Sequence, residues 1–218
     1  EWGDVALLFR ASTAFGVYED ALERAGIPFV TVAGRGFYDR PEIRDLLNAL
    51  AAIADPTDDL ALLGLLRSPA FAIPDAEIYK LRFPNQSATP SKLLDSLHNS
   101  DFIIHNFDSS FIFHLSSLLE EFHALAGRAP AATILKRLLD LTHYRAILAS
   151  DPNGARMIRN VEKLLADAHR SRLVSLTDFL AYVQTLRDVG LREGEAPADA
   201  SSSGAVQLMT VHKAKGLE

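Results

Sequence analysis

The most informative part of this 218-residue chain is the stretch VQLMTVHKAKGLE, residues 206–218. It begins as an apolar-rich run of strand length and then presents a hydroxyl, an imidazole and two ammonium groups, from Thr210, His212, Lys213 and Lys215. Parallel α/β sheets bind their ligands at the carboxyl ends of the strands. The pattern therefore predicts a strand followed by a phosphate-facing cluster, with a solvated basic turn as the alternative interpretation.

The first third of the chain predicts a strand, a helix and a second strand. Residues 4–10 are a continuous apolar run that ends in Arg10, as a buried parallel strand would. Residues 12–25 carry apolar side chains at helical spacing, with Phe15 and Tyr18 on the face predicted to be buried. A β-branched strand comes next, so the region has the pattern of a right-handed βαβ unit.

The region between this unit and the final strand consists of amphipathic helical patterns. Residues 39–42 are a helix-start signature, with a capping Asp, a Pro in the first turn and a Glu after it. Residues 191–204 are rich in Gly, Ser, Ala and acidic residues, which predicts a flexible linker. The predicted helices cover residues 43–53, 60–67, 111–125, 131–149, 153–169 and 176–186.

These patterns together predict a mostly α-helical chain with a partial α/β layer. The layer should contain parallel strands near residues 5–9, 28–33 and 206–210, with a helical insertion between them. We expect the first and last of these strands to lie in one sheet, although the helical region separates them in sequence.

Composition excludes several classes of protein. The chain has no Cys, which excludes disulfides and thiolate metal sites, and its His residues lack the spacing of metal ligands. No apolar run reaches the roughly 20 residues of a membrane span and no signal peptide opens the chain, so we expect a cytoplasmic protein without a membrane partner. The net charge of −6 argues against strong unaided binding to nucleic acid.

The end of the chain resembles motif V of the UvrD/Rep family of superfamily 1 DNA helicases, in which a strand leads into Thr-x-His-x-[Ser/Ala]-Lys-Gly-Leu-Glu. The resemblance implies that Thr210, His212 and Lys213 face DNA. It also implies that Gly216 and Glu218 belong to an ATP site, where the Glu reaches the ribose.

The first strand resembles that of motif IV in the same family, whose final Arg contacts an ATP phosphate. The resemblance therefore assigns Arg10 to ATP binding. The chain has neither a Gly-x-x-x-x-Gly-Lys-[Ser/Thr] phosphate loop nor an acidic strand for Mg²⁺. We therefore expect no catalytic residue here and no ATPase activity in the isolated chain.

Residues 34–45 are similar to the family's Gly-x-x-Phe-[Phe/Tyr]-x-Arg-x-Glu-Ile-[Lys/Arg]-Asp segment. Within it, Glu42 and Asp45 are expected to cap and brace a helix. Phe37 and Tyr38 are expected to be core residues, with base stacking as the alternative.

Residues 155–164 resemble the Arg-x-x-Asn-Leu-x-x-Leu helix of AddA/RecB-type members. Cations on and after this helix predict either a basic stripe for duplex DNA or a solvated helix face. They are Arg156, Arg159, Lys163, Arg170 and Arg172.

The resemblance implies a RecA-like, P-loop NTPase motor fold. Residues 1–95 and 205–218 would form part of the second motor domain (2A), residues 96–190 a helical 2B insertion, and residues 191–204 the linker. Both ends look cut, so we expect a fragment of an ATP-dependent 3′–5′ DNA helicase or translocase of repair or recombination. The expected ligands and partners are ATP and Mg²⁺ in the full-length protein, single-stranded and duplex DNA, the first motor domain, and a nuclease/helicase partner subunit.

Two other functions fit parts of the pattern. A non-catalytic, α-rich interaction module with a degenerate helicase fold would explain the helices, but such a module has no need of the complete run Thr210–Glu218. A small-molecule enzyme would need a nucleophile with a base or a metal cluster, and the sequence shows neither.

Overall fold

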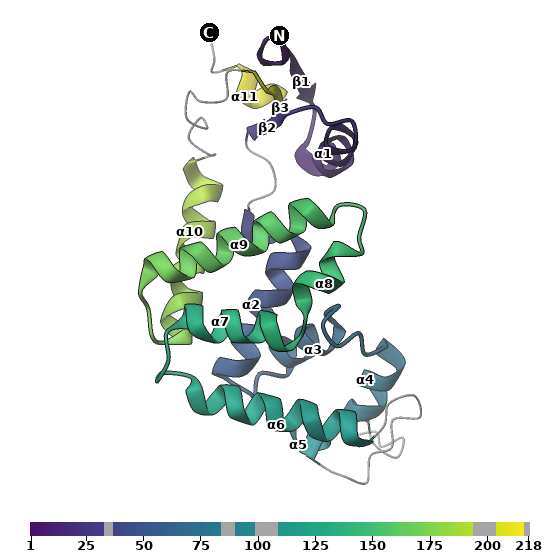
Figure 1. Cartoon of the computed structure of the whole chain (residues 1–218), viewed down its shortest axis with the longest axis vertical. Coiled ribbons are helices and arrows are strands. Elements are labelled where there is room, and N and C mark those ends of the chain that lie inside the picture. The colour runs from purple at the N-terminus through teal and green to yellow at the C-terminus, as the bar shows by residue number, and fades with distance from the viewer. Residues whose placement is uncertain (33–36, 84–89, 99–108, 194–203, 216–218) are drawn as a thin grey trace. The chain divides into compact units, whose positions relative to one another are not determined.

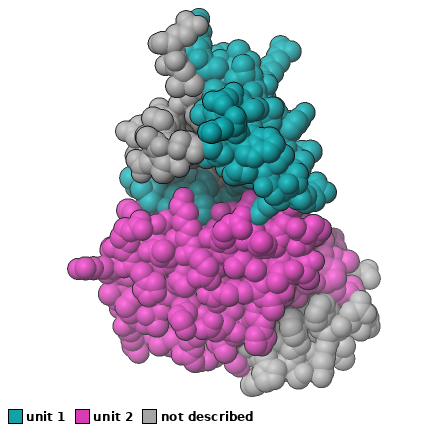
Figure 2. Space-filling view, turned by 45° about the horizontal axis from the view of Figure 1, so that its top comes forward, with its two compact units in different colours: residues 1–40, 184–218 teal, residues 41–183 magenta. Residues whose placement is uncertain are grey.

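The computed structural model describes residues 1–32, 37–83, 90–98, 109–193 and 204–215. The chain forms two compact units, coloured separately in Figure 2: residues 1–40 with 184–218, and residues 41–183. The helices on both sides of the domain boundary predicted near residue 95 pack into the second unit. The assignment of residues 1–95 and 205–218 to the 2A domain, and of residues 96–190 to the 2B insertion, stays a prediction.

The first unit contains a parallel sheet with the strand order β1-β3-β2. Its strands are β1 (Ala6–Phe9), β2 (Phe29–Val32) and β3 (Val206–Thr210). β3 therefore lies between two strands from the other end of the chain, which confirms that the first and last predicted strands share a sheet (Figure 1). β3 is largely buried, as expected for a central parallel strand.

β1 is more exposed than its apolar sequence predicts. The Leu8 side chain is 56% exposed, whereas Phe9 packs edge-to-face against Phe15 and Tyr18 of α1 (Phe15–Arg24). Alternate residues of a strand point to opposite faces, so one face of β1 is covered by α1 while the other is open among the described residues. The expectation of a buried strand was wrong for this reason.

Helix α1 also differs from the predicted pattern. Phe15 is buried as expected, but Tyr18 is 46% exposed and the neighbouring Glu19 is only 2% exposed. Glu19 is accommodated because Thr31 of β2 and Arg40 donate hydrogen bonds to its carboxylate, at 2.6 and 2.8 Å. A buried carboxylate needs such donors to offset its lost hydration.

The rest of the first unit is made of short elements. The 3₁₀ turns η1 (Trp2–Asp4), η2 (Ser12–Ala14) and η3 (Phe37–Asp39) precede β1, α1 and α2 respectively. Arg187, on the last part of α10 (Leu176–Glu193), donates to the Asp39 carboxylate and so ties η3 to this helix. The short helix α11 (Val211–Ala214) follows β3 directly.

The second unit is helical in its described residues. Its elements are α2 (Pro41–Ala54), α3 (Asp59–Arg67), α4 (Asp75–Arg82), α5 (Leu93–His98), α6 (Ser109–Leu125), α7 (Ala131–Leu141), α8 (Tyr144–Ala149), α9 (Gly154–Ser171) and the first part of α10. α2 packs against α3, α6 and α9, and its Ile43 and Leu50 side chains are fully buried. Among the described residues, no helix is long and apolar enough to cross a membrane.

Two predicted helix boundaries need correction. The helix expected over residues 131–149 is broken into α7 and α8, because His143 adopts a left-handed conformation with φ of 50°. α10 continues to Glu193, beyond the predicted end at residue 186. Of the predicted linker, residues 191–193 are therefore helical, Gly204 is part of a turn, and residues 194–203 lie outside the described residues.

Candidate nucleotide and nucleic-acid site

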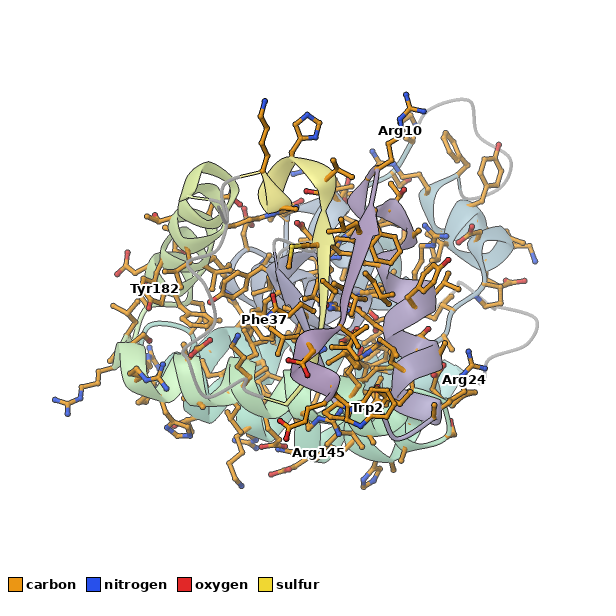
Figure 3. The ribbon with its side chains drawn as sticks, turned by 90° about the horizontal axis from the view of Figure 1, so that it is seen from above. Trp2, Arg10, Arg24, Phe37, Arg145 and Tyr182 are labelled. Atoms are coloured by element: carbon orange, nitrogen blue, oxygen red, sulfur yellow. The ribbon has the colours of Figure 1, made fainter. Side chains whose placement is uncertain are left out.

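The candidate site lies at the carboxyl edge of the sheet in the first unit. β1 and β3 are parallel neighbours in which Phe9 is opposite Thr210, so the next residue of each strand leaves the sheet at the same edge. In Figure 3, the Arg10 side chain extends from the end of β1 on the side of the sheet where α11 lies. Parallel strands thus bring together two predicted site segments that are 200 positions apart.

The predicted DNA-facing residues occupy the end of β3 and the helix that follows. Thr210 is the last residue of β3 and is partly exposed, and His212 is exposed on α11. Lys213 belongs to α11 as well, and α11 packs against β1 in addition to β3. The predicted ATP residues Gly216 and Glu218 lie outside the described residues.

The end of β1 is anchored by aromatic packing. The Phe9 ring centroid lies 4.9 Å from that of Phe15 and 4.8 Å from that of Tyr18, both in edge-to-face geometry. Such pairs add to the stability that area burial provides. Because Arg10 follows this anchored residue directly and its own side chain is exposed, the cation is held at a fixed backbone position while its guanidinium remains accessible.

This arrangement can bind anions. A planar, permanently charged guanidinium can grip phosphate oxygens, and the hydroxyl and imidazole at the end of β3 can donate to a phosphate backbone. Within the described ranges, no group of three or more His, Cys, Asp or Glu side chains is placed to hold a metal ion. The edge can therefore supply contacts to an anion.

Comparison with known proteins identifies the fold that carries this edge. A model of the UvrD-like helicase C-terminal domain matches residues 1–218. The chain belongs to this family. It is also the family whose motifs IV and V resemble residues 5–10 and 210–218 of this chain.

Three relatives of this UvrD-like domain are each named as one subunit of an ATP-dependent helicase/nuclease. The protein from Thermoanaerobacter pseudethanolicus is 26% identical over 222 residues, covering 100% of the chain and 18% of the relative. The one from Desulforudis audaxviator is 27% identical over 219 residues, covering 99% and 18%. The one from Leuconostoc mesenteroides is 29% identical over 222 residues, covering 100% and 17%. The chain thus spans less than a fifth of the length of these relatives.

The segment of residues 37–45 in this UvrD-like domain has structural contacts. Glu42, in the first turn of α2 and 3% exposed, accepts a hydrogen bond from the Asn160 amide of α9 at 2.7 Å. Asp45 accepts one from the Tyr144 hydroxyl at 3.2 Å. Both carboxylates therefore brace α2, as expected. The Glu42 contact also joins two segments that resemble the helicase family, residues 34–45 and residues 155–164.

Phe37 and Tyr38 are partly exposed rather than fully buried. Their rings pack edge-to-face with centroids 5.0 Å apart. The expectation that they are core residues was too strong, because both side chains keep part of their surface exposed. Nothing in their geometry favours base stacking over packing against each other.

Sequence reasoning missed Glu19, Thr31 and Arg40 as a connected group. Arg40 is 24% exposed and its ion pair with the buried Glu19 ties α1 to the residue that precedes α2. The available signal was an acidic residue four positions after Phe15, on the buried side of an amphipathic helix. Its partners could not be identified, because they follow in sequence by 12 and 21 positions.

The Asp45 carboxyl provides a pH-dependent test of this packing. Burial raises its pKa, against the lowering effects of the Tyr144 hydrogen bond and of Arg44. A raised carboxyl pKa in the folded state favours folding at low pH, and this contribution is lost as pH rises through the folded-state pKa. Asp45→Asn is therefore expected to raise the urea midpoint at neutral pH, while the difference from wild type disappears in acid.

The matched control is Asp140→Asn. Hydrogen bonding from Lys136 lowers the pKa of this exposed carboxyl, so its ionised form stabilises the folded state, opposite to that of Asp45. The variant is expected to lose a small amount of stability at neutral pH, and its difference from wild type should also vanish as pH falls through the Asp140 pKa. A lower midpoint for Asp45→Asn at neutral pH would contradict the described burial of Asp45.

Proposed function

We propose that this chain is the part of an ATP-dependent 3′–5′ DNA helicase or translocase, acting in DNA repair or recombination, that supplies ATP phosphate and single-stranded DNA contacts. Residues 1–95 and 205–218 would correspond to part of the second RecA-like motor domain (2A), and residues 96–190 to its 2B insertion. The family match and the relatives named as helicase/nuclease subunits support the proposal.

The observation that carries the proposal is the parallel pairing of β1 with β3. It puts Arg10 and the segment beginning at Thr210 at one sheet edge. A motor that couples nucleotide chemistry to movement along DNA needs contacts to both ligands on one rigid element. Adjacent strands of one sheet meet that need, because a shift at one strand end is transmitted through the backbone hydrogen bonds to the next.

Each residue would have a distinct role in this site. Arg10 would bind a phosphate of ATP through its guanidinium, while Thr210, His212 and Lys213 would contact the DNA backbone. Gly216 and Glu218 would complete the nucleotide site, with the carboxylate at the ribose. The exposed, anchored cation at Arg10 fits a phosphate, but these residues make up only one side of an ATP site.

The remaining chemistry would come from the rest of the polypeptide. A first motor domain would supply the phosphate loop and the Mg²⁺ ligands, so we propose that this chain alone does not hydrolyse ATP. The relatives' name includes a nuclease and the word subunit, which motivates the further proposal of a nuclease domain and a partner subunit. A DNA substrate would place the protein in the cytoplasm.

His212→Ala in the full-length protein tests the DNA side of the site. Losing an exposed imidazole at the DNA backbone should weaken DNA binding more than ATP binding. We expect the single-stranded DNA concentration for half-maximal ATPase stimulation to rise about tenfold, the effect of losing about 1.4 kcal/mol of binding free energy. The KM for ATP should change much less.

His98→Ala is the matched control, because His98 is an exposed imidazole on α5 in the other unit, hydrogen-bonded to Glu120. It should leave the DNA requirement unchanged. A DNA requirement that stays the same in His212→Ala would remove α11 from the DNA site. An ATPase of the full-length protein that does not respond to DNA at all would favour the interaction-module alternative.

A further inference from the structure

A small pocket lies within the second unit, among α2, α3, α7 and the start of α8 (Figure 1). It holds about 220 Å³ of space free of protein atoms, counting the part that is open to solvent. Pockets for drug-sized ligands measure about 300–1,000 Å³, so this one suits a group of only a few heavy atoms. Most of its wall is apolar. The apolar lining residues are Leu46, Ala49, Leu65, Ala70, Phe71 and Leu138.

Asp45 of α2 supplies the charged group of this pocket. Its carboxylate accepts a hydrogen bond from the Tyr144 hydroxyl at 3.2 Å, which is long for an O–H···O bond. Two further hydroxyls line the pocket, those of Ser68 and Thr142, but each donates at 2.7 Å to a carbonyl oxygen of the helix that it follows. Tyr144 is therefore the one lining residue that donates to Asp45 in the described part of the chain.

The negative charge of Asp45 is incompletely compensated. Burial raises the pKa of this carboxyl, while the Tyr144 hydrogen bond and Arg44 lower it and Glu42 raises it further. Among the described residues, no cationic side chain lies within ion-pair distance of Asp45. A partly buried carboxylate that keeps one hydrogen-bond donor costs stability at neutral pH, the same cost that Asp45→Asn is expected to remove. A cation in the pocket would offset this cost, so the site favours a cationic ligand.

The turns beside the pocket have unusual backbone conformations. Of the three non-glycine residues with positive φ in the described part of the chain, two adjoin lining residues. Ala72, with φ of 51°, follows Phe71, and His143, with φ of 50°, lies between Thr142 and Tyr144. Left-handed conformations are unfavourable for residues with a Cβ, and they gather at sites that hold ligands. A mere packing defect would not need such turns, whereas a ligand site uses them to hold its lining residues in place.

We propose that this pocket binds a primary ammonium group at the end of a short aliphatic chain. The ammonium would donate to the Asp45 carboxylate, and the aliphatic carbons would lie against the apolar wall. An ammonium is a compact charge that suits a small pocket, whereas a guanidinium spreads its charge over a planar fork. A free alkylamine and the side chain of a lysine in another polypeptide share this chemistry, so the test includes both. The site does not depend on the proposed function, because neither ATP nor DNA enters its assignment.

The test is a titration of the 218-residue chain with n-butylammonium chloride at neutral pH and constant ionic strength, followed by NMR of its Leu methyl groups. We expect the signals of Leu46, Leu65 and Leu138 to shift and to saturate, because these side chains line the pocket. n-Butanol has the same carbon chain without the charge, and its half-saturating concentration should be at least about tenfold higher. The second probe is Nα-acetyl-lysine methylamide. Equal affinity for this probe would identify lysine side chains as ligands, and binding of butylammonium alone would restrict the site to free amines.

Asp45→Asn removes the charge but keeps the shape of the side chain, so it should raise the half-saturating butylammonium concentration at least about tenfold. This variant is expected to fold, since it should be more stable than wild type at neutral pH. The control is Asp140→Asn, which removes an exposed carboxylate of α7 from outside the pocket and should bind butylammonium like wild type. Equal affinities of wild type and Asp45→Asn would overturn the proposal. Equal responses to butylammonium and butanol would overturn it too, because they would indicate apolar filling alone.

Discussion

Full-length protein carrying Arg10→Ala is expected to hydrolyse ATP about 10²- to 10³-fold more slowly than wild type at saturating single-stranded DNA. A cation held against a transferring phosphate stabilises charge that develops in the transition state, so its loss lowers kcat and not merely affinity. The anchored end of β1 fixes the backbone from which this guanidinium extends. The measurement is the steady-state ATPase rate at saturating ATP and DNA.

Two companion variants separate the site from general charge effects. Arg10→Lys keeps the charge but loses the planar fork, so it should recover only part of the rate. Arg24→Ala removes an exposed cation from α1 of the same unit, where the side chain donates to the Asp20 carbonyl oxygen at 3.1 Å, and should behave like wild type. An ATPase rate of Arg10→Ala equal to that of Arg24→Ala would show that Arg10 is a surface residue.

The sheet could be predicted because its signals are local. The apolar runs at residues 4–10 and 206–210 each predict a strand from their own residues. The end of the chain also carries a specific nine-residue pattern. Their pairing followed from the resemblance to one motor fold and is confirmed by the register of Phe9 with Thr210. Arg10 and His212 were assigned to the site by the resemblance to motifs IV and V, and these assignments stay predictions.

The features that could not be predicted depend on partners distant in sequence. The burial of Glu19 depends on donors from Thr31 and Arg40, which no periodicity in α1 indicates. The exposure of Leu8 depends on which elements cover each face of β1. The division after residue 40 arises because α2 packs with later helices. It could not be predicted, because an amphipathic pattern shows which face of a helix is buried but not which helix covers that face.

Gly154→Ala is expected to destabilise the chain by about 3 kcal/mol, at the upper end of the usual range for overpacking. Gly154 is buried at the start of α9, and a Cβ there would lie 2.2 Å from the Leu148 carbonyl oxygen and 3.0 Å from the Ala149 Cα. Both contacts are with the backbone of α8, so no side-chain rotation can relieve them. The urea midpoint of the 218-residue chain should fall accordingly.

Gly16→Ala is the matched control for the glycine substitution. Gly16 lies in α1, a Cβ there would have nothing within 4 Å, and its conformation is helical. Ala is favoured over Gly in a helix by up to about 1 kcal/mol, so this variant should be slightly more stable than wild type. The two substitutions add the same methyl group. Opposite changes in the urea midpoint would therefore assign the destabilisation by Gly154→Ala to the close approach of the α8 backbone to α9. If Gly154→Ala unfolded at the wild-type midpoint, α9 could not be seated against the α8 carbonyl as described, and the position of Asn160 beside Glu42 would need revision with it.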